Sequence, residues 1–147
     1  MDEVDRAILE ALERHGRISN AELAAHIGLS PSPCLRRMRR LEETGVIRGY
    51  RAVIDPAAMG RSLRVFAGVR LVRHGRKEVV AFEHAVIQLS EVVACHHVTG
   101  NYDYLLHVEV ADLPAYENFH ANRLAGLPNV GAVTSYVTMK TLPDEFT

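Results

Sequence analysis

The stretch from Leu29 to Gly45, LSPSPCLRRMRRLEETG, constrains the fold most, because it predicts one helix with two different faces. Ser30 suits the N-cap of a helix, Pro31 suits its first turn, and Gly45 suits its C-terminal end. Apolar side chains recur at helical spacing and predict a face that packs against a core: Cys34, Leu35, Met38 and Leu41.

The opposite face of this predicted helix is strongly basic. It carries four arginines within five positions, Arg36, Arg37, Arg39 and Arg40. Residues 30–51 hold six arginines against two glutamates, whereas residues 1–29 hold three arginines against six carboxylates. A net charge of −1 for the whole chain therefore hides a local basic patch. A helix with a packed back and a guanidinium front suits a phosphate-lined groove of duplex DNA.

The residues before this helix place it in a helix-turn-helix. Residues 2–15 have apolar positions three and four apart and predict an amphipathic helix that ends at Gly16. Ser19-Asn20-Ala21-Glu22 is a capping box that opens a second, short helix, and Gly28 turns the chain into the basic helix. This order, with the basic helix third, is that of a DNA-reading helix-turn-helix.

Residues 46–54 are β-rich and predict a short hairpin or strand, a wing beside the reading helix. Arg48 and Arg51 would reach the DNA backbone from it, or else they are solvated arginines on a linker. Asp55-Pro56 and the small residues up to Gly60 are typical of a hinge. We therefore expect a DNA-binding domain over residues 1–54, a hinge over 55–62 and a second domain over 63–147.

The second domain has a different pattern. Strands are predicted at 65–72, 91–99, 104–111 and 132–142, with a helix at 76–90 and another beginning at Pro114. The order βαββαβ is ferredoxin-like, with helices on one face of the sheet. The fold class is thus α+β. We expect the other face to be strongly apolar and to pack against a second copy of the chain.

The remaining composition favours a cytoplasmic protein. No apolar run is long enough to span a membrane, and the acidic start MDEVDR does not resemble a signal peptide. Cys34 and Cys95 are far apart and outside any CxxC pattern, so we expect two buried thiols in a reducing compartment. No cofactor is predicted.

The chain resembles the Lrp/AsnC family of transcriptional regulators over essentially its whole length. The resemblance rests on several short motifs in order, which run through both predicted domains: Asp5-Arg6-Ile8-Leu9, Gly16-Arg17-Ile18-Ser19, Gly28-Leu29-Ser30, Cys34-Leu35, Arg37-Arg40-Leu41-Glu42, Gly45-Val46-Ile47, Gly100-Asn101-Tyr102-Asp103-Tyr104, Leu127-Pro128-Asn129-Val130 and the Thr134–Thr138 strand.

The resemblance implies a homodimer, or a ring of dimers such as an octamer, that binds double-stranded promoter DNA and senses a small amino acid. On the helix-turn-helix we expect DNA contacts from Ser30, Ser32, Pro33, Arg36, Arg37, Arg40, Arg48 and Arg51. The resemblance places the effector site between dimers. We expect it to be formed by Val98, Thr99, Gly100, Asn101, Tyr102, Asp103 and Tyr104, with Tyr136 from the last strand of a neighbouring subunit.

The chemistry of the loop suits that ligand. A free amino acid needs a carboxylate near its ammonium group, which Asp103 would supply, and N–H donors near its carboxylate, which Gly100 and Asn101 would supply. The alternative is turn chemistry alone, in which Asp103 accepts hydrogen bonds from nearby backbone N–H groups.

Two other functions fit parts of the sequence. Small oxygenases use βαββαβ dimers, but an enzyme of that kind leaves residues 1–51 unexplained. A metal-responsive regulator would use histidines and other donors of the second domain: Cys95, His96, His97, His107 and Glu109. Because no HxxxH or CxxC spacing supports a metal site, we expect partly buried, hydrogen-bonded imidazoles instead.

Overall fold

A computed structural model of the chain describes residues 1–143. By its internal contacts the chain divides into two compact units, the first spanning Met1–Val53 and the second beginning at Ile54. The segment expected to be a hinge, residues 55–62, belongs to the second unit and contains the short helix η1 (Pro56–Met59).

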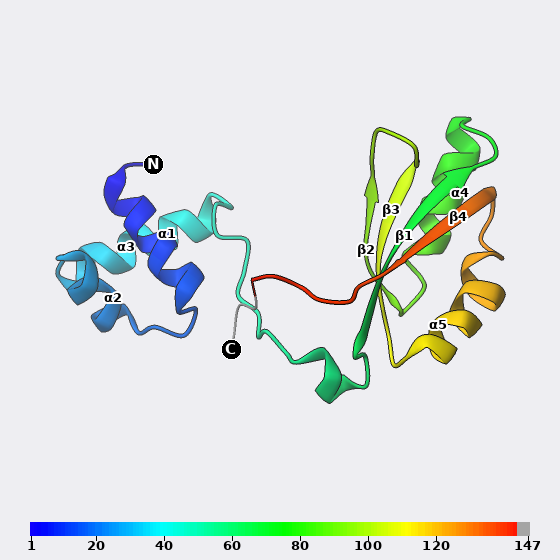
Figure 1. Cartoon of the computed structure of the whole chain (residues 1–147). Coiled ribbons are helices and arrows are strands. Elements are labelled where there is room, and N and C mark those ends of the chain that lie inside the picture. The colour runs from blue at the N-terminus through cyan, green and yellow to red at the C-terminus, as the bar shows by residue number, and fades with distance from the viewer. Residues whose placement is uncertain (144–147) are drawn as a thin grey trace. The chain divides into compact units, whose positions relative to one another are not determined.

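The first unit is built from α1 (Glu3–Arg14), α2 (Asn20–Ile27) and α3 (Pro31–Glu43) (Figure 1). Both hydrogen bonds of the predicted capping box at Ser19 and Glu22 are present, and Asp2 and Asp5 form a second box at the start of α1. The three helices enclose a small apolar core: Ile8, Ala11, Leu12, Leu23, Ala24, Cys34 and Leu41.

The turn between α2 and α3 depends on Gly28. Its φ of 76° is left-handed, and its N–H points back to the carbonyls of Ala24 and Ala25. Ser30 occupies the N-cap of α3 and Pro31 its first turn, as expected. Within the described residues, however, the Ser30 side chain makes no capping hydrogen bond. Ser30 therefore stands at the N-cap position without capping a backbone N–H group.

The hairpin or strand expected at residues 46–54 is not formed. Ile47 donates to the Leu41 carbonyl across 2.9 Å, which closes the end of α3, and residues 48–54 are irregular. A strand needs a neighbouring strand for its backbone hydrogen bonds, and residues 1–143 provide none beside this segment. The apolar side chains of Tyr50, Val53 and Ile54 are therefore exposed.

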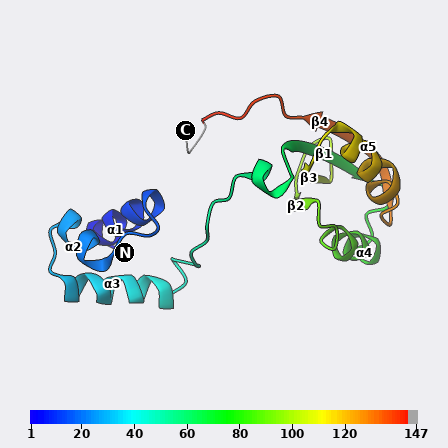
Figure 2. The same ribbon diagram turned by 90° about the horizontal axis from the view of Figure 1, so that it is seen from below.

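The second unit has the predicted βαββαβ order. It consists of β1 (Leu63–Leu71), α4 (Arg76–Val86), β2 (Val92–His97), β3 (Tyr104–Val110), α5 (Leu113–Phe119) with a π-helical turn (His120–Leu124), and β4 (Val130–Val137). The strand order in the sheet is β2-β3-β1-β4, with each neighbouring pair antiparallel. In Figure 2, α4 and α5 lie on one side of the sheet.

The apolar set Val65, Ala67, Val69 and Leu71 faces this unit's core. Successive residues of a strand point to opposite faces, so the helix-free face carries Arg64, Phe66 and Arg70. The neighbouring strands add Leu105, His107, Glu109, Thr134 and Tyr136 to that face. The expectation of a strongly apolar open face was therefore wrong, because most of its side chains are polar.

The burial of the cysteines and histidines differs in part from what the sequence predicted. Cys34 is fully buried, but Cys95 is only partly so, and burial raises the pKa of the Cys95 thiol to about 11. His96 and His97 are exposed rather than partly buried. Over residues 1–143, no helix is long and apolar enough to cross a membrane.

Candidate DNA-binding and effector sites

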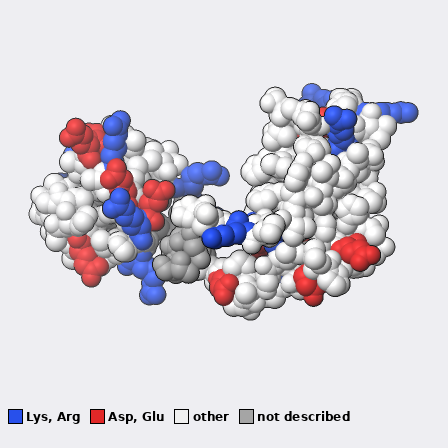
Figure 3. Space-filling view, viewed as in Figure 1, with Lys and Arg blue, Asp and Glu red and all other residues white. Residues whose placement is uncertain are grey.

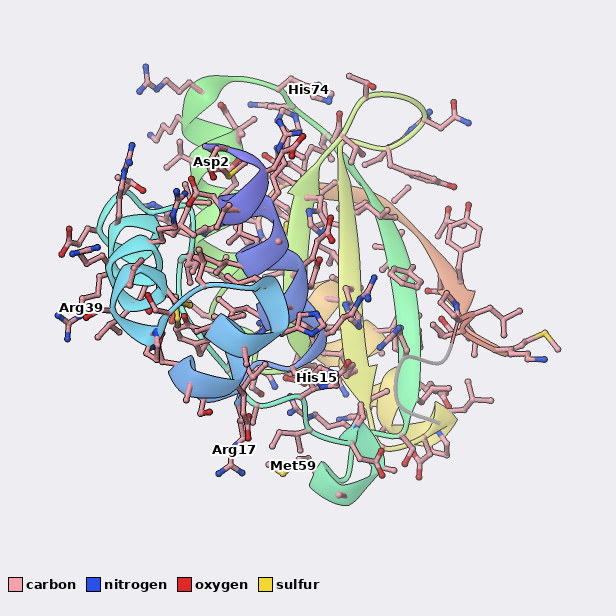
Figure 4. The ribbon with its side chains drawn as sticks, turned by 90° about the vertical axis from the view of Figure 1, so that its left-hand side faces the viewer. Asp2, His15, Arg17, Arg39, Met59 and His74 are labelled. Carbon is pink, nitrogen blue, oxygen red and sulfur yellow. The ribbon has the colours of Figure 1, made fainter. Side chains whose placement is uncertain are left out.

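The outer face of α3 carries the basic patch. Arg36, Arg39 and Arg40 are exposed, and none of them forms an ion pair within residues 1–143. Ser32 is also exposed and Pro33 is partly so. The back of the helix is held by the buried side chains of Cys34 and Leu41. In Figure 4, Arg39 points away from the helix axis into open space.

Arg37 is in a different situation from its neighbours. Its Nη1 donates to both carboxylate oxygens of Asp2, at 2.8 and 2.7 Å, and to Asp5 Oδ1 at 3.0 Å. The backbone N–H of Asp5 and the Arg37 guanidinium lower the pKa of Asp2 to about 2. Arg37, expected at the DNA surface, is partly exposed there and also ties α3 to α1.

Basic and acidic groups meet in a shallow hollow on this unit. The hollow measures about 340 Å³ and is lined by Asp2, Pro33, Arg36, Arg37 and Arg40. Figure 3 shows acidic and basic side chains close together on the first unit. Six of the expected DNA-contacting residues are exposed: Ser30, Ser32, Arg36, Arg40, Arg48 and Arg51.

The second candidate site is the loop between β2 and β3. The N–H of Val98 donates to the Asp103 carbonyl at 3.0 Å, and the N–H of Asp103 donates to the Val69 carbonyl at 2.9 Å. Thr99, Gly100 and Asn101 are exposed at the tip. Gly100 has a φ of 113°, a backbone conformation that favours glycine.

The Asp103 carboxylate already has partners in the chain. It accepts the backbone N–H of Leu71 at 2.7 Å, and His74 Nε2 lies 3.0 Å from both of its oxygens. The Leu71 N–H, followed by His74, lowers the pKa of Asp103. His74, labelled in Figure 4, was missed by the sequence reasoning. It follows β1, and only the pairing of β1 with β3 brings it to Asp103.

The tyrosines of the loop have different surroundings. The Tyr102 hydroxyl lies 2.8 Å from the hydroxyl of Tyr136. Tyr136 was expected from a neighbouring subunit, yet it meets Tyr102 within one chain. Tyr104 is only 2% exposed, and the centroid of its ring lies 4.8 Å from that of Phe82. Its hydroxyl donates a hydrogen bond to Glu83. Tyr104 is thus a core residue and does not line the loop surface, because its side chain points toward the helices.

The fold and these two sites define a two-domain regulator, with a helix-turn-helix for DNA and a ferredoxin-like domain for a ligand. Residues 1–48 match the family model described as winged helix-turn-helix DNA-binding. Residues 64–146 match the Lrp/AsnC ligand binding domain. The chain belongs to the Lrp/AsnC family of transcriptional regulators.

Individual relatives agree with this assignment. The leucine-responsive regulatory protein of Escherichia coli K12 is 44% identical over 140 residues, which are 95% of this chain and 85% of that protein. A transcriptional regulator of Neisseria meningitidis, solved in complex with L-Met, superposes with a TM-score of 0.92 at 34% identity, over 97% of this chain and 92% of that one. An AsnC family regulator from Agrobacterium tumefaciens gives a TM-score of 0.91 at 35% identity, with the same coverage.

These findings decide between the functions considered for the sequence. The relatives are named as transcriptional regulators, so the chain is a regulator and not an enzyme, and the oxygenase alternative has no support. The metal-responsive alternative has none either, since the part of the chain described here groups no three His, Cys, Asp or Glu side chains around a common point.

Proposed function

We propose that residues 1–54 bind duplex promoter DNA sequence-selectively through Ser30, Ser32, Pro33, Arg36 and Arg40 of α3, with Arg48 and Arg51 adding contacts to the DNA backbone. The observation that supports this most is that Arg36 and Arg40 are exposed and unpaired within residues 1–143. Both lie on a helix whose other face is buried. Free guanidinium groups on a fixed helix suit base edges and phosphates.

The test is selection of binding sites from random duplex DNA, followed by affinity measurement on the selected site. Arg36→Ala/Arg40→Ala should weaken binding by about 1–3 kcal/mol for each arginine that reads a guanine. The matched control is Arg14→Ala/Arg17→Ala, which removes two exposed arginines of the same unit outside α3. Equal affinity of the α3 variant and the wild type would exclude this surface.

For the second unit we propose a small amino acid as the effector, bound around Val98–Asp103. The family model is that of a ligand binding domain, and the Neisseria relative was solved with L-Met. The Asp103 carboxylate suits an ammonium group, which would share its two oxygens with the Leu71 N–H and His74. Gly100 and Asn101 are exposed residues, and their backbone N–H groups suit the ligand carboxylate.

A thermal-shift screen with the twenty amino acids tests this proposal, because a ligand that binds only the native state raises its stability. Asp103→Asn keeps an acceptor for the Leu71 N–H but loses the charge. It should fold, bind DNA and lose the thermal shift. A variant that responds at the wild-type concentration would remove Asp103 from the site.

We further propose a cytoplasmic homodimer, assembled into a ring of dimers. The second unit has two unpaired sheet edges among the described strands, β2 and β4, with exposed Val93 and Val137 on them. Exposed edges of this kind favour association with another chain. The two free cysteines suit a reducing compartment. Sedimentation should show at least a dimer at micromolar concentration, and a stable monomer would contradict it.

A further inference from the structure

Two carboxylates at the start of α1 hold Arg37, the N-cap Asp2 and Asp5 in the first turn, and they differ in exposure. The side chain of Asp5 is 11% exposed, whereas that of Asp2 is 55% exposed. Asp5 therefore acts as an internal partner that fixes α3 against α1. Asp2 stands at the surface, at the start of α1 (Figure 4), and lines the same hollow as Arg36 and Arg40.

The position of Asp2 matters for any phosphate that approaches α3. Its two oxygens lie 2.8 and 2.7 Å from Arg37 Nη1, as the oxygens of a bound phosphate would. A DNA phosphate entering the hollow would compete with this carboxylate for Arg37 and would meet a like charge. Binding to arbitrary DNA depends almost entirely on phosphate neutralisation. The negative charge of Asp2 should therefore reduce the affinity for arbitrary DNA more than the affinity for a specific site.

We propose that Asp2 is a specificity-determining residue that occupies Arg37 and keeps the backbone phosphates of arbitrary DNA out of the hollow. Contacts of Arg36 and Arg40 with a correct site do not need Arg37 and remain. Asp2 thereby lowers non-specific affinity more than specific affinity. This inference rests on the proposed DNA-binding function of α3.

The variant Asp2→Asn isolates the charge. Asn is as good an N-cap as Asp, so the bond from the Asp5 N–H to the side chain at position 2, 2.9 Å long, is kept. Asp2→Ser is a second neutral N-cap, which guards against a folding defect peculiar to one side chain. The matched control is Glu3→Gln, which removes the same charge one residue further along α1. Glu3 has no hydrogen bond or ion pair with Arg37 within residues 1–143.

Fluorescence anisotropy is measured with a selected site and with random duplex DNA, in a series of salt concentrations. Both Asp2 variants should bind random DNA about threefold or more tightly than the wild type, the size expected for one exposed ionic contact. Their affinity for the selected site should change less, so the ratio of the two affinities falls. The salt dependence on random DNA should steepen by about one per protomer, since one more phosphate is neutralised. Glu3→Gln should leave the ratio unchanged.

Two results would overturn the inference. If Glu3→Gln raises the affinity for random DNA as much as the Asp2 variants do, the effect is one of net charge. If the Asp2 variants bind random DNA equally or more weakly, Asp2 does not repel phosphates. Both results require wild-type protein that binds its selected site. Failure of the wild type to bind any DNA would instead overturn the proposed function, and the inference with it.

Discussion

The ring of Tyr102 covers Gly68 so closely that a Cβ at position 68 would lie 2.7 Å from its Cγ and Cδ2 atoms. Gly68 lies in β1, on the face opposite α4 and α5, and Tyr102 lies in the loop before β3. The absence of a side chain at position 68 thus sets the position of the tyrosine, and through its hydroxyl contact that of Tyr136.

Gly68→Ala should therefore displace the Tyr102 ring. Overpacking of this kind typically destabilises by about 1–3 kcal/mol, which urea denaturation can measure. The amino-acid response of the loop should weaken in parallel. Adding Tyr102→Ala removes the clashing ring. The double variant should therefore lose less stability than the sum of the losses of the two single variants. Additive losses would show that the two residues are not coupled.

A second prediction concerns the turn of the helix-turn-helix. Gly28 has a left-handed backbone and open space around its Cα, so a substitution there meets conformational strain and no clash. Gly28→Ala should destabilise the first unit by about 1–2 kcal/mol. Gly28→Asn should lose less, because Asn tolerates this conformation better. Thermal unfolding compares the two, and equal losses would argue against backbone strain.

The third prediction is a pH dependence. Since the Leu71 N–H and His74 lower the pKa of Asp103 below its ordinary value of 3.8, the folded state favours the ionised carboxylate. The resulting stabilisation is fully present above pH 3.8 and disappears as the pH falls through the lowered value. Asp103→Asn should therefore be less stable than the wild type at neutral pH and approach it in acid. A stability difference that does not change down to pH 2 would exclude this ionisation as its source.

The sequence predicted the features that depend on neighbours along the chain. The Ser19–Glu22 capping box joins residues three apart, and both of its bonds are observed. The order of helices and strands followed from hydrophobic periodicity in the same way. The strand expected at 46–54 failed, because β propensity does not supply a partner strand.

Contacts between residues that are far apart in the sequence could not be predicted from local motifs or periodicity. Arg37 and Asp2 are 35 positions apart, and their pairing depends on how α3 packs on α1. Tyr104 belongs to the same sequence motif as Gly100–Asp103 and was therefore predicted to line the effector site. In the sheet it lies opposite Val69, which places its side chain on the buried face. His74 meets Asp103 only because β1 and β3 are adjacent. The sequence thus predicted which residues form the two candidate sites, while it could not predict the partners of their charged groups.

The salt dependence of binding tests the central claim, that α3 binds DNA through Arg36 and Arg40. For wild-type protein on its selected site, log K should fall with log salt at a slope of about −5 to −7, as expected when roughly six to eight phosphates are neutralised per dimer. Arg36→Ala/Arg40→Ala removes four arginines per dimer. The slope should become shallower by about one for each of them that contacts a phosphate, whereas each one that reads a guanine should cost affinity with little change in slope. The control Arg14→Ala/Arg17→Ala should keep the wild-type slope. An α3 variant with both the slope and the affinity of the wild type, or a slope near zero in the wild type, would contradict the claim.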